Sequence, residues 1–434
     1  MKKRILCLCS IVVLTAVMLL SLVSCKKTDL LSGTAEFSSW GTRISDNDGA
    51  LSFSGFFGDS PLESYSLALG ELEYSGDIAY RSFIQDEGWQ GWKTGSDVSG
   101  KEDKNILGIQ IMLIGHVANY YDISYRVRYS SEWQEWVSNG TLAGETSTPI
   151  VGLEVRLSPK TDNIRDTAWT LTEYGDDDGR QSEFYTLKNN DTGTLIVIDG
   201  GWDANTSQVR SVINMLGGHV DYWFITHYDA DHVSAFNNIY ADPGDITIGT
   251  VYATPLDYDL YCTYAADRWW DTPEVYERFL NQTSGDERIV YLSRDDSFTI
   301  DGLDVYVYNA FDQIVVDTGN PDVANYGSLM FKITGVSDSF LVCGDVYGDV
   351  MGSILLNMYG SDMRANIVQP GHHGNHSMSS DFYAVIEPSI MFFDGPKWLT
   401  EGKEYTAKDL IAWCEECGIT YYEYSTAPNS IPFE

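Results

Sequence analysis

The sequence predicts a chain with two structured parts, an N-terminal all-β repeat domain and a larger α/β domain. A pattern of tryptophans and glycines recurs in the first part, whereas segments with strand spacing and helical spacing alternate in the second. The chain has 434 residues, which is enough for two or three domains of about 100–200 residues each. With 43% hydrophobic and 13% aromatic residues, it has enough apolar side chains to fill packed cores.

The first residues have the composition of an export signal. Three basic residues at positions 2–4 precede an apolar run over residues 5–24, which approaches the length of a membrane-spanning helix. The run ends in Leu-Val-Ser-Cys at positions 22–25, and small residues before a cut point favour cleavage. This ending resembles the lipobox of bacterial lipoproteins. The resemblance implies a signal peptide over residues 1–24, acylation of Cys25, and a lipid-anchored protein on the outer face of the cell membrane. An uncleaved anchor would leave the chain on the same side.

Residues 34–159 contain an internal repeat, which follows a polar linker over residues 25–33. Trp89, Gly100 and Gly108 recur 44 residues later as Trp133, Gly144 and Gly152. Each unit alternates apolar and polar residues between glycine turns, which predicts strands; a third, weaker copy is expected over residues 40–72. The pattern resembles the clostridial hydrophobic-with-Trp (ChW) repeats of Gram-positive surface proteins, which implies a surface module that binds a glycan or protein. Repeated tryptophans also commonly fill repeat cores, and the sequence leaves both roles open.

The second domain is expected over residues 160–434. A strand over 195–198 ends at Asp199, a helix follows over 207–216, and the next strand covers 220–226. Cys414 and Cys417 fall on one turn of an amphipathic C-terminal helix, so we expect neither a disulfide framework nor a cysteine metal site.

Candidate metal ligands cluster in two short segments. The sequence His-Tyr-Asp-Ala-Asp-His over residues 227–232 follows a strand directly, and His-His-Gly-Asn-His over 372–376 follows the apolar segment 365–368. A further apolar segment, 340–343, leads to Asp345. Five of the seven histidines lie in the first two segments. Carboxylates packed this densely repel one another unless a cation is present, so the pattern predicts a divalent metal site.

These motifs resemble the metallo-β-lactamase superfamily over about residues 165–434, which implies an αββα sandwich and a hydrolase with two divalent ions. Zinc suits mixed imidazole and carboxylate ligands, with manganese or iron as alternatives. The resemblance assigns His227 and Asp229 to the first metal, and Asp231, His232 and His373 to the second. It also assigns Asp345 to both metals and a catalytic role to Asp231. His372 would face the substrate as a proton donor or oxyanion partner, Asp199 would orient a ligand, and His376 would shape the loop.

Two departures narrow the expected subfamily. Asp229 replaces the second histidine of the motif, and no further histidine lies between His232 and Asp345, where Asn325 stands instead. This combination is similar to the extracellular hydrolase domain of ComEC proteins and to the pneumococcal phosphorylcholine esterase, which implies a phosphodiesterase. The net charge of -36 disfavours bulk binding of nucleic acid.

The substrate stays open at this point. Residues 211–267 and 365–396 contain no lysine or arginine, which argues against a nuclease. Aromatic residues near the motifs would suit a cationic choline group, although most are expected in the core: Trp202, Trp223, Tyr228, Trp269 and Trp270. The alternatives are a ComEC-like nuclease, a surface adhesin with a degenerate hydrolase domain, and a lactamase or thioester hydrolase.

Overall fold

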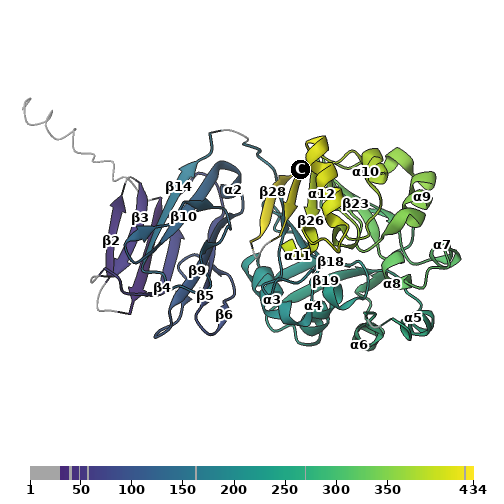
Figure 1. The fold of residues 1–434 in the computed structure, drawn as a ribbon, viewed down its shortest axis with the longest axis horizontal. Coiled ribbons are helices and arrows are strands. Elements are labelled where there is room, and N and C mark those ends of the chain that lie inside the picture. The colour runs from purple at the N-terminus through teal and green to yellow at the C-terminus, as the bar shows by residue number, and fades with distance from the viewer. Residues whose placement is uncertain are drawn as a thin grey trace, which may run out of the picture.

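The computed structural model describes residues 30–38, 42–47, 49–55, 58–161, 164–268, 270–424 and 427–434 (Figure 1). The expected signal peptide, its Cys25 and Trp269 lie outside these residues. Within the described part, no helix is both long and apolar enough to cross a membrane. Figure 1 shows a β-rich part followed by an α/β part, in the order that the sequence predicts.

The N-terminal part consists of three antiparallel sheets around one apolar core, to which Phe53, Leu67, Ile109 and Val127 contribute. The sheet orders are β1-β4-β8, β11-β10-β14-β3-β2 and β13-β9-β5-β6. The elements are β1 (Leu31–Phe37), β2 (Thr42–Asn47), β3 (Ala50–Gly55), β4 (Leu62–Leu69), β5 (Asp77–Ile84), β6 (Gly88–Trp89), β7 (Lys93–Thr94), β8 (Ser99–Gly100), β9 (Ile106–Ile114), α2 (Val117–Tyr120), β10 (Tyr121–Tyr129), β11 (Glu132–Trp133), β12 (Val137–Ser138), β13 (Ala143–Gly144) and β14 (Gly152–Pro159). The first strand begins at Leu31, so residues 31–33, expected in the linker, pair with β4 instead.

The sequence repeat is also a structural repeat. Strands β6, β7 and β8 begin 44 residues before β11, β12 and β13. Gly100 and Gly144 both have positive φ angles, +117° and +107°. A Cβ atom would lie 2.2 Å from the Glu63 carbonyl oxygen in the first case and 2.5 Å from that of Leu107 in the second. The repeated glycine is therefore required because a neighbouring backbone passes too close for any side chain.

The C-terminal part is a sandwich of two seven-stranded sheets, ordered β20-β19-β18-β17-β16-β15-β28 and β21-β22-β23-β24-β25-β26-β27. The strands are β15 (Trp169–Glu173), β16 (Phe184–Asn189), β17 (Leu195–Asp199), β18 (His219–Ile225), β19 (Thr247–Ala253), β20 (Ile289–Tyr291), β21 (Ser297–Ile300), β22 (Leu303–Asn309), β23 (Met330–Thr334), β24 (Ser339–Val342), β25 (Ile367–Gln369), β26 (Ile390–Phe393), β27 (Thr420–Glu423) and β28 (Asn429–Phe433). Side chains such as Ile198, Phe224 and Phe331 fill the space between the sheets.

Helices cover the outer face of each sheet. Helices α3, α4 and α6 pack on the first sheet, and α9, α10 and α12 on the second. The helices are α3 (Thr206–Met215), α4 (Ala230–Ala241), α5 (Tyr258–Ala265), α6 (Pro273–Thr283), α7 (Gln313–Asp317), α8 (Val323–Tyr326), α9 (Gly348–Met358), α10 (Ser380–Ile386), α11 (Lys397–Thr400) and α12 (Ala407–Cys417), with 3-10 turns η1 (Asp203–Asn205), η2 (Gly360–Met363) and η3 (His372–Gly374). This arrangement confirms the predicted αββα sandwich. Cys414 is buried in α12 and Cys417 is exposed, and both are free thiols.

Candidate metal centre

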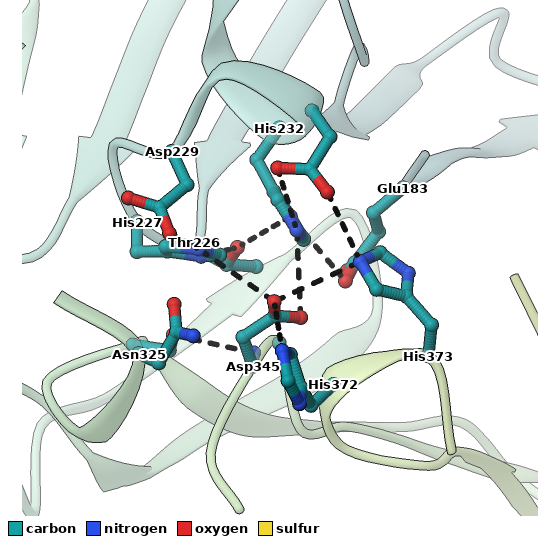
Figure 2. Close-up of polar contacts among 12 residues, drawn as sticks. Glu183, Thr226, His227, Asp229, His232, Asn325, Asp345, His372 and His373 are labelled. Carbon is teal, nitrogen blue, oxygen red and sulfur yellow. Dashed lines mark hydrogen bonds and ion pairs between the residues drawn. The ribbon is translucent and has the colours of Figure 1, made fainter. Parts of the chain in front are cut away.

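The predicted ligands meet where strands of the two sheets end. Strands β17 and β18 run parallel in one sheet, and β24 and β25 run parallel in the other. Asp199 ends β17, the segment 227–232 follows β18, Asp345 follows β24, and the pair at 372–373 follows β25. Parallel strands end on the same edge of a sheet, and the side chains of His227, His232, His372 and His373 converge on Asp345 (Figure 2).

The first group of ligand atoms surrounds His227. Its Nε2 atom lies 3.6 Å from Asp229 Oδ2 and 3.9 Å from Asp345 Oδ2. His227 is fully buried, and Asp229 precedes the first turn of α4. These three residues are the ones that the resemblance assigned to the first metal, whereas the ligand atoms that all lie within 4.8 Å of one another here belong to His227, His232 and Asp345.

The second group joins both sheets. His232 Nε2 lies 3.9 Å from Asp231 Oδ1, and His373 Nε2 lies 3.4 Å from Asp231 Oδ2. Asp345 faces the same space, with Oδ1 3.4 Å from His232 Nε2 and Oδ2 3.7 Å from His373 Nε2. Asp345 Oδ2 is therefore shared by both groups, as expected of a carboxylate between two metals. The structure thus brings all six predicted ligands together.

The donor atoms of this site fit divalent cations. The Nε2 atoms of His227, His232 and His373 and the Oδ1 atom of Asp345 are buried and have no hydrogen-bond partner among the described residues. A buried polar atom without a partner destabilises a fold by about 1–3 kcal/mol. Four such atoms around one point indicate an ion-binding site, because coordination would satisfy all of them at once.

The electrostatics of the cluster also call for positive charge. Burial opposes ionisation of Asp345, yet the adjacent His232 and His373 outweigh it and hold the pKa of Asp345 well below its usual value. Burial likewise opposes protonation of His373, but Asp345 and Asp231 raise the pKa of that imidazole well above its usual value. The buried carboxylates therefore stabilise positive charge at this site, whether protons or metal ions carry that charge.

Asp199 fixes the orientation of His232. Its carboxylate accepts hydrogen bonds from His232 Nδ1 at 2.8 Å, from the Thr226 backbone N–H at 2.8 Å and from the Thr226 hydroxyl at 2.5 Å. The proton of the neutral imidazole therefore sits on Nδ1, and the lone pair of Nε2 points at the ligand cluster. Asp199 holds a left-handed backbone conformation, with φ +52°, which an aspartate tolerates better than most residues.

Three side chains that support the predicted ligands were not predicted from the sequence. Glu183 Oε2 lies 3.7 Å from His232 Nδ1, and Asp394 Oδ2 lies 3.6 Å from His373 Nδ1; both carboxyl groups are fully buried. Burial and the nearby Asp199 and Asp394 raise the pKa of Glu183 well above its usual value. Tyr261 donates a hydrogen bond to Asp229 Oδ1 at 3.1 Å. Only Asp394 has a recognisable sequence signal, since it follows β26 in the same strand-Asp-Gly pattern as Asp199.

His372 lies at the edge of the cluster and faces the open side. Its Nδ1 atom donates to the Asn375 carbonyl oxygen at 2.7 Å, because a carbonyl can only accept, and its Nε2 lies 3.9 Å from Asp345 Oδ2. The neutral ring therefore presents a proton acceptor to the site, and a proton-donor role requires the doubly protonated ring. His372 and His373 both have a φ of +55°. Such strained backbone persists only where its surroundings enforce it, and it concentrates at functional sites.

An open cavity of about 540 Å³ leads to these groups. Its lining is acidic and aromatic, without lysine or arginine: Gln181, Trp202, Asp229, Asp231, Trp270, Thr272, Asp322, Asn325, Asp345, Tyr347, His372 and His376. Of the aromatic residues predicted near the motifs, Trp202 and Trp270 reach this cavity, whereas Trp223 and Tyr228 are fully buried in the core.

Comparison with known proteins supports the superfamily. Residues 178–251 match the family model described as metallo-beta-lactamase superfamily, a segment that carries Glu183, Asp199 and the 227–232 motif. No curated protein matches the chain in sequence.

Solved structures with a similar arrangement share little sequence with this chain. CmlA, a diiron beta-hydroxylase from Streptomyces venezuelae, is 12% identical with a TM-score of 0.40; the match covers 64% of this chain and 55% of CmlA, so the chain spans about half of that protein. The metallo-beta-lactamase fold protein YhfI from Bacillus subtilis is 10% identical with a TM-score of 0.37, over 61% of this chain and 99% of YhfI. Igni18, a metallo hydrolase from Ignicoccus hospitalis, is 12% identical with a TM-score of 0.38, over 61% of this chain and 99% of Igni18. The C-terminal part of the chain therefore has a metallo-beta-lactamase-like fold, and residues 178–251 within it match the superfamily's model.

Proposed function

We propose that this protein is a metal-dependent phosphodiesterase anchored at the cell surface. His227 and Asp229 would hold one divalent ion, Asp231, His232 and His373 a second, and Asp345 would contact both. The observation that carries the proposal is the set of four buried, unpartnered donor atoms, one of them on Asp345, which lines an open cavity. Their mixture of imidazole and carboxylate suits zinc, with manganese or iron as alternatives.

Two such ions would lower the pKa of water and stabilise charge on both the attacking and the leaving oxygen. The protein's own groups supply the rest. Asp231, whose side chain is 13% exposed, lines the cavity and orients the nucleophilic water. His372 presents Nε2 to the same space, where it accepts a proton and, once doubly protonated, donates it to the leaving oxygen.

The cavity favours a small phosphodiester over a nucleic acid. Its lining contains four carboxylates and no lysine or arginine, whereas a nuclease neutralises several phosphates along its track. We therefore favour a cell-wall or lipid phosphodiester as substrate, with a ComEC-like nuclease as the alternative. Trp202 and Trp270 would support a cationic substituent on that substrate. Arg180 and Arg268 already lie over these rings, at 5.3 and 5.0 Å, so a substrate cation would use the opposite faces.

Hydrolysis of bis-p-nitrophenyl phosphate by zinc-loaded protein tests the proposal. We expect Asp231→Ala and His373→Ala to abolish turnover while the circular dichroism spectrum is retained. His116→Ala is the matched control, because His116 also pairs with an aspartate, Asp191 at 2.9 Å, and neither residue lines the cavity. Unchanged wild-type turnover after exhaustive removal of metal would contradict the proposal. Purified protein without any transition metal would favour the alternative of an adhesin with a degenerate hydrolase domain.

The same preparation should be screened against DNA, a thioester and a β-lactam, because the fold alone does not select the substrate. Surface anchoring is tested separately. We expect Cys25→Ala to move the protein from the membrane fraction to the soluble fraction, whereas an uncleaved anchor would keep the variant in the membrane.

A further inference from the structure

One arginine of the repeat domain reaches into the hydrolase domain. Arg81, on β5, is 1% exposed and lies between the rings of Trp89 and Trp92, at 4.3 and 5.0 Å from their centroids. Its Nε donates to Gln110 Oε1 at 2.7 Å. Its two terminal nitrogens donate to both carboxylate oxygens of Asp177, at 3.0 and 2.9 Å. This paired geometry is the strongest that an arginine and a carboxylate form.

Asp177 belongs to the loop 174–183, which forms part of the catalytic cavity. Four residues after Asp177, Gln181 lines the cavity, and its carbonyl oxygen accepts a hydrogen bond from Trp202 Nε1 at 2.7 Å. Two residues later, the Glu183 backbone N–H donates to the carbonyl oxygen of Asp231 at 3.2 Å. The loop therefore connects the arginine of the repeat domain to the backbone of a predicted metal ligand within six residues.

The next repeat contains the same arginine with a different partner. Arg126, on β10, lies between Trp133 and Trp136, at 5.0 and 4.7 Å. Arg81 pairs across strands with Gln110, and Arg126 pairs in the same way with Glu154. Arg126 is neutralised within its own repeat by Glu154, at 2.7 Å. In the earlier repeat the neutral Gln110 occupies that position, so the charge of Arg81 is matched by Asp177 of the other domain.

Apolar contacts reinforce this docking. Trp92 and Met112 of the repeat domain belong to the same buried cluster as Val209 and Val212 of α3. A Cβ atom on Gly91 would lie 2.8 Å from Ser211 Oγ and 3.1 Å from its Cβ, so α3 approaches the repeat domain closely at this glycine. The corresponding position in the next repeat, 44 residues later, is Glu135. The Gly91 surface of the earlier repeat thus packs on α3, whereas the later repeat carries a charged residue at the corresponding position.

We propose that Arg81 is a positioning residue for the catalytic cavity. Through Asp177 it holds loop 174–183 in place. The loop in turn positions Gln181 at the cavity wall and the backbone of Asp231. The repeat domain is then a structural part of the active site as well as a surface module. The inference is tested by hydrogen–deuterium exchange and by enzyme kinetics. The kinetic test rests on the proposed hydrolysis, whereas the exchange test does not.

Hydrogen–deuterium exchange of the full chain tests this inference directly. In Arg81→Gln and in Asp177→Asn we expect the amides of 175–183 to exchange about tenfold faster, as expected for the loss of a charge-assisted hydrogen bond. Arg126→Gln is the matched control, because it removes the equivalent arginine without touching the loop, and its 175–183 amides should exchange as in the wild type. Bound metal should be unchanged in all three variants.

Kinetics separate positioning from general destabilisation. We expect Arg81→Gln to lower kcat/KM for bis-p-nitrophenyl phosphate about tenfold, since small misplacements in a site have large kinetic effects, and Arg81→Lys to restore part of it. Wild-type exchange of 175–183 in both variants, or equal loosening in Arg126→Gln, would overturn the inference. If Arg81→Gln fails to fold, Asp177→Asn decides the question, because Asp177 lies on a loop and its side chain is 25% exposed. If the wild-type protein has no hydrolytic activity, the proposed function is refuted, but the exchange experiment still tests the positioning role of Arg81.

Discussion

Replacing Asp199 by asparagine should move a proton on His232 and weaken metal binding without unfolding the protein. The Asp199 carboxylate is fully buried and accepts three hydrogen bonds, from the Thr226 N–H and hydroxyl and from His232 Nδ1. In Asp199→Asn the side-chain carbonyl can still accept from the Thr226 N–H. The amide NH₂ then faces His232 Nδ1, and two donors cannot bond to each other.

The favourable response is a change of tautomer. His232 Nδ1 becomes an acceptor and its proton moves to Nε2, the atom that lies 3.4 Å from Asp345 Oδ1 in the ligand cluster. A protonated Nε2 has no lone pair for a metal ion. Loss of an orienting partner of this kind lowers metal affinity about 10–100-fold, and one mismatched buried hydrogen bond lowers the free energy of unfolding by about 1–3 kcal/mol.

Zinc titration calorimetry and elemental analysis measure the affinity, and urea unfolding of the metal-free protein measures the stability. Asp191→Asn is the matched control, since Asp191 also hydrogen-bonds a histidine, His116 Nε2 at 2.9 Å, with a carboxylate side chain that is 64% exposed. We expect the control to bind zinc like the wild type. If Asp199→Asn also binds zinc with wild-type affinity at both sites, the tautomer argument is refuted.

Three further predictions address the metal, the core and a buried acid. Zinc at a hundred times its Kd should raise the free energy of unfolding by about 2.7 kcal/mol, and a thermal shift that is the same with and without a chelator would contradict this. Phe331→Ala should lower the free energy of unfolding by about 3–5 kcal/mol, because Phe331 is fully buried between the sheets and stacks on Phe224 with centroids 4.6 Å apart; exposed Val336→Ala is the control for the same urea measurement. Burial raises the pKa of Glu173 well above its usual value. The contribution of this group to the free energy of unfolding is therefore fully present below the unfolded pKa of about 4.3. That contribution is lost as the pH rises through the pKa of the folded state. Glu173→Gln should therefore gain thermal stability relative to the wild type between pH 5 and pH 8, and an unchanged difference between these pH values would contradict the assignment.

The position of the ligand cluster was predictable because its signals are local. Each ligand segment follows an apolar run that ends abruptly, as at Cys343-Gly344-Asp345, and Asp199, which orients a ligand, follows Ile198 in the same way. Runs of this kind form parallel strands, and parallel strands of one sheet end at the same edge. This rule places the ligands at one edge of each sheet, and the resemblance to the metallo-β-lactamase superfamily implied that His227, Asp345 and His373, which follow strands of two sheets, would meet.

The supporting side chains could not be predicted in the same way. Glu183 lies in an irregular loop before β16, and Tyr261 lies on a helix that has no place in the motif pattern. Their contacts with His232 and Asp229 arise only when the two sheets and the helices around them are packed. Asp394 differs from these two, because its strand-Asp-Gly pattern matches that of Asp199 and is a local signal.

The sequence by itself determined the two-part architecture, the 44-residue period that places Gly100 and Gly144, and the identity of six metal-binding candidates, because each depends on spacing along one stretch of chain. Only the tertiary structure decided which tryptophans pack against arginine and which line the cavity, and that Arg81 reaches Asp177. These contacts join residues that are far apart in the chain. They depend on how two domains and two sheets pack, which no local pattern of side chains encodes.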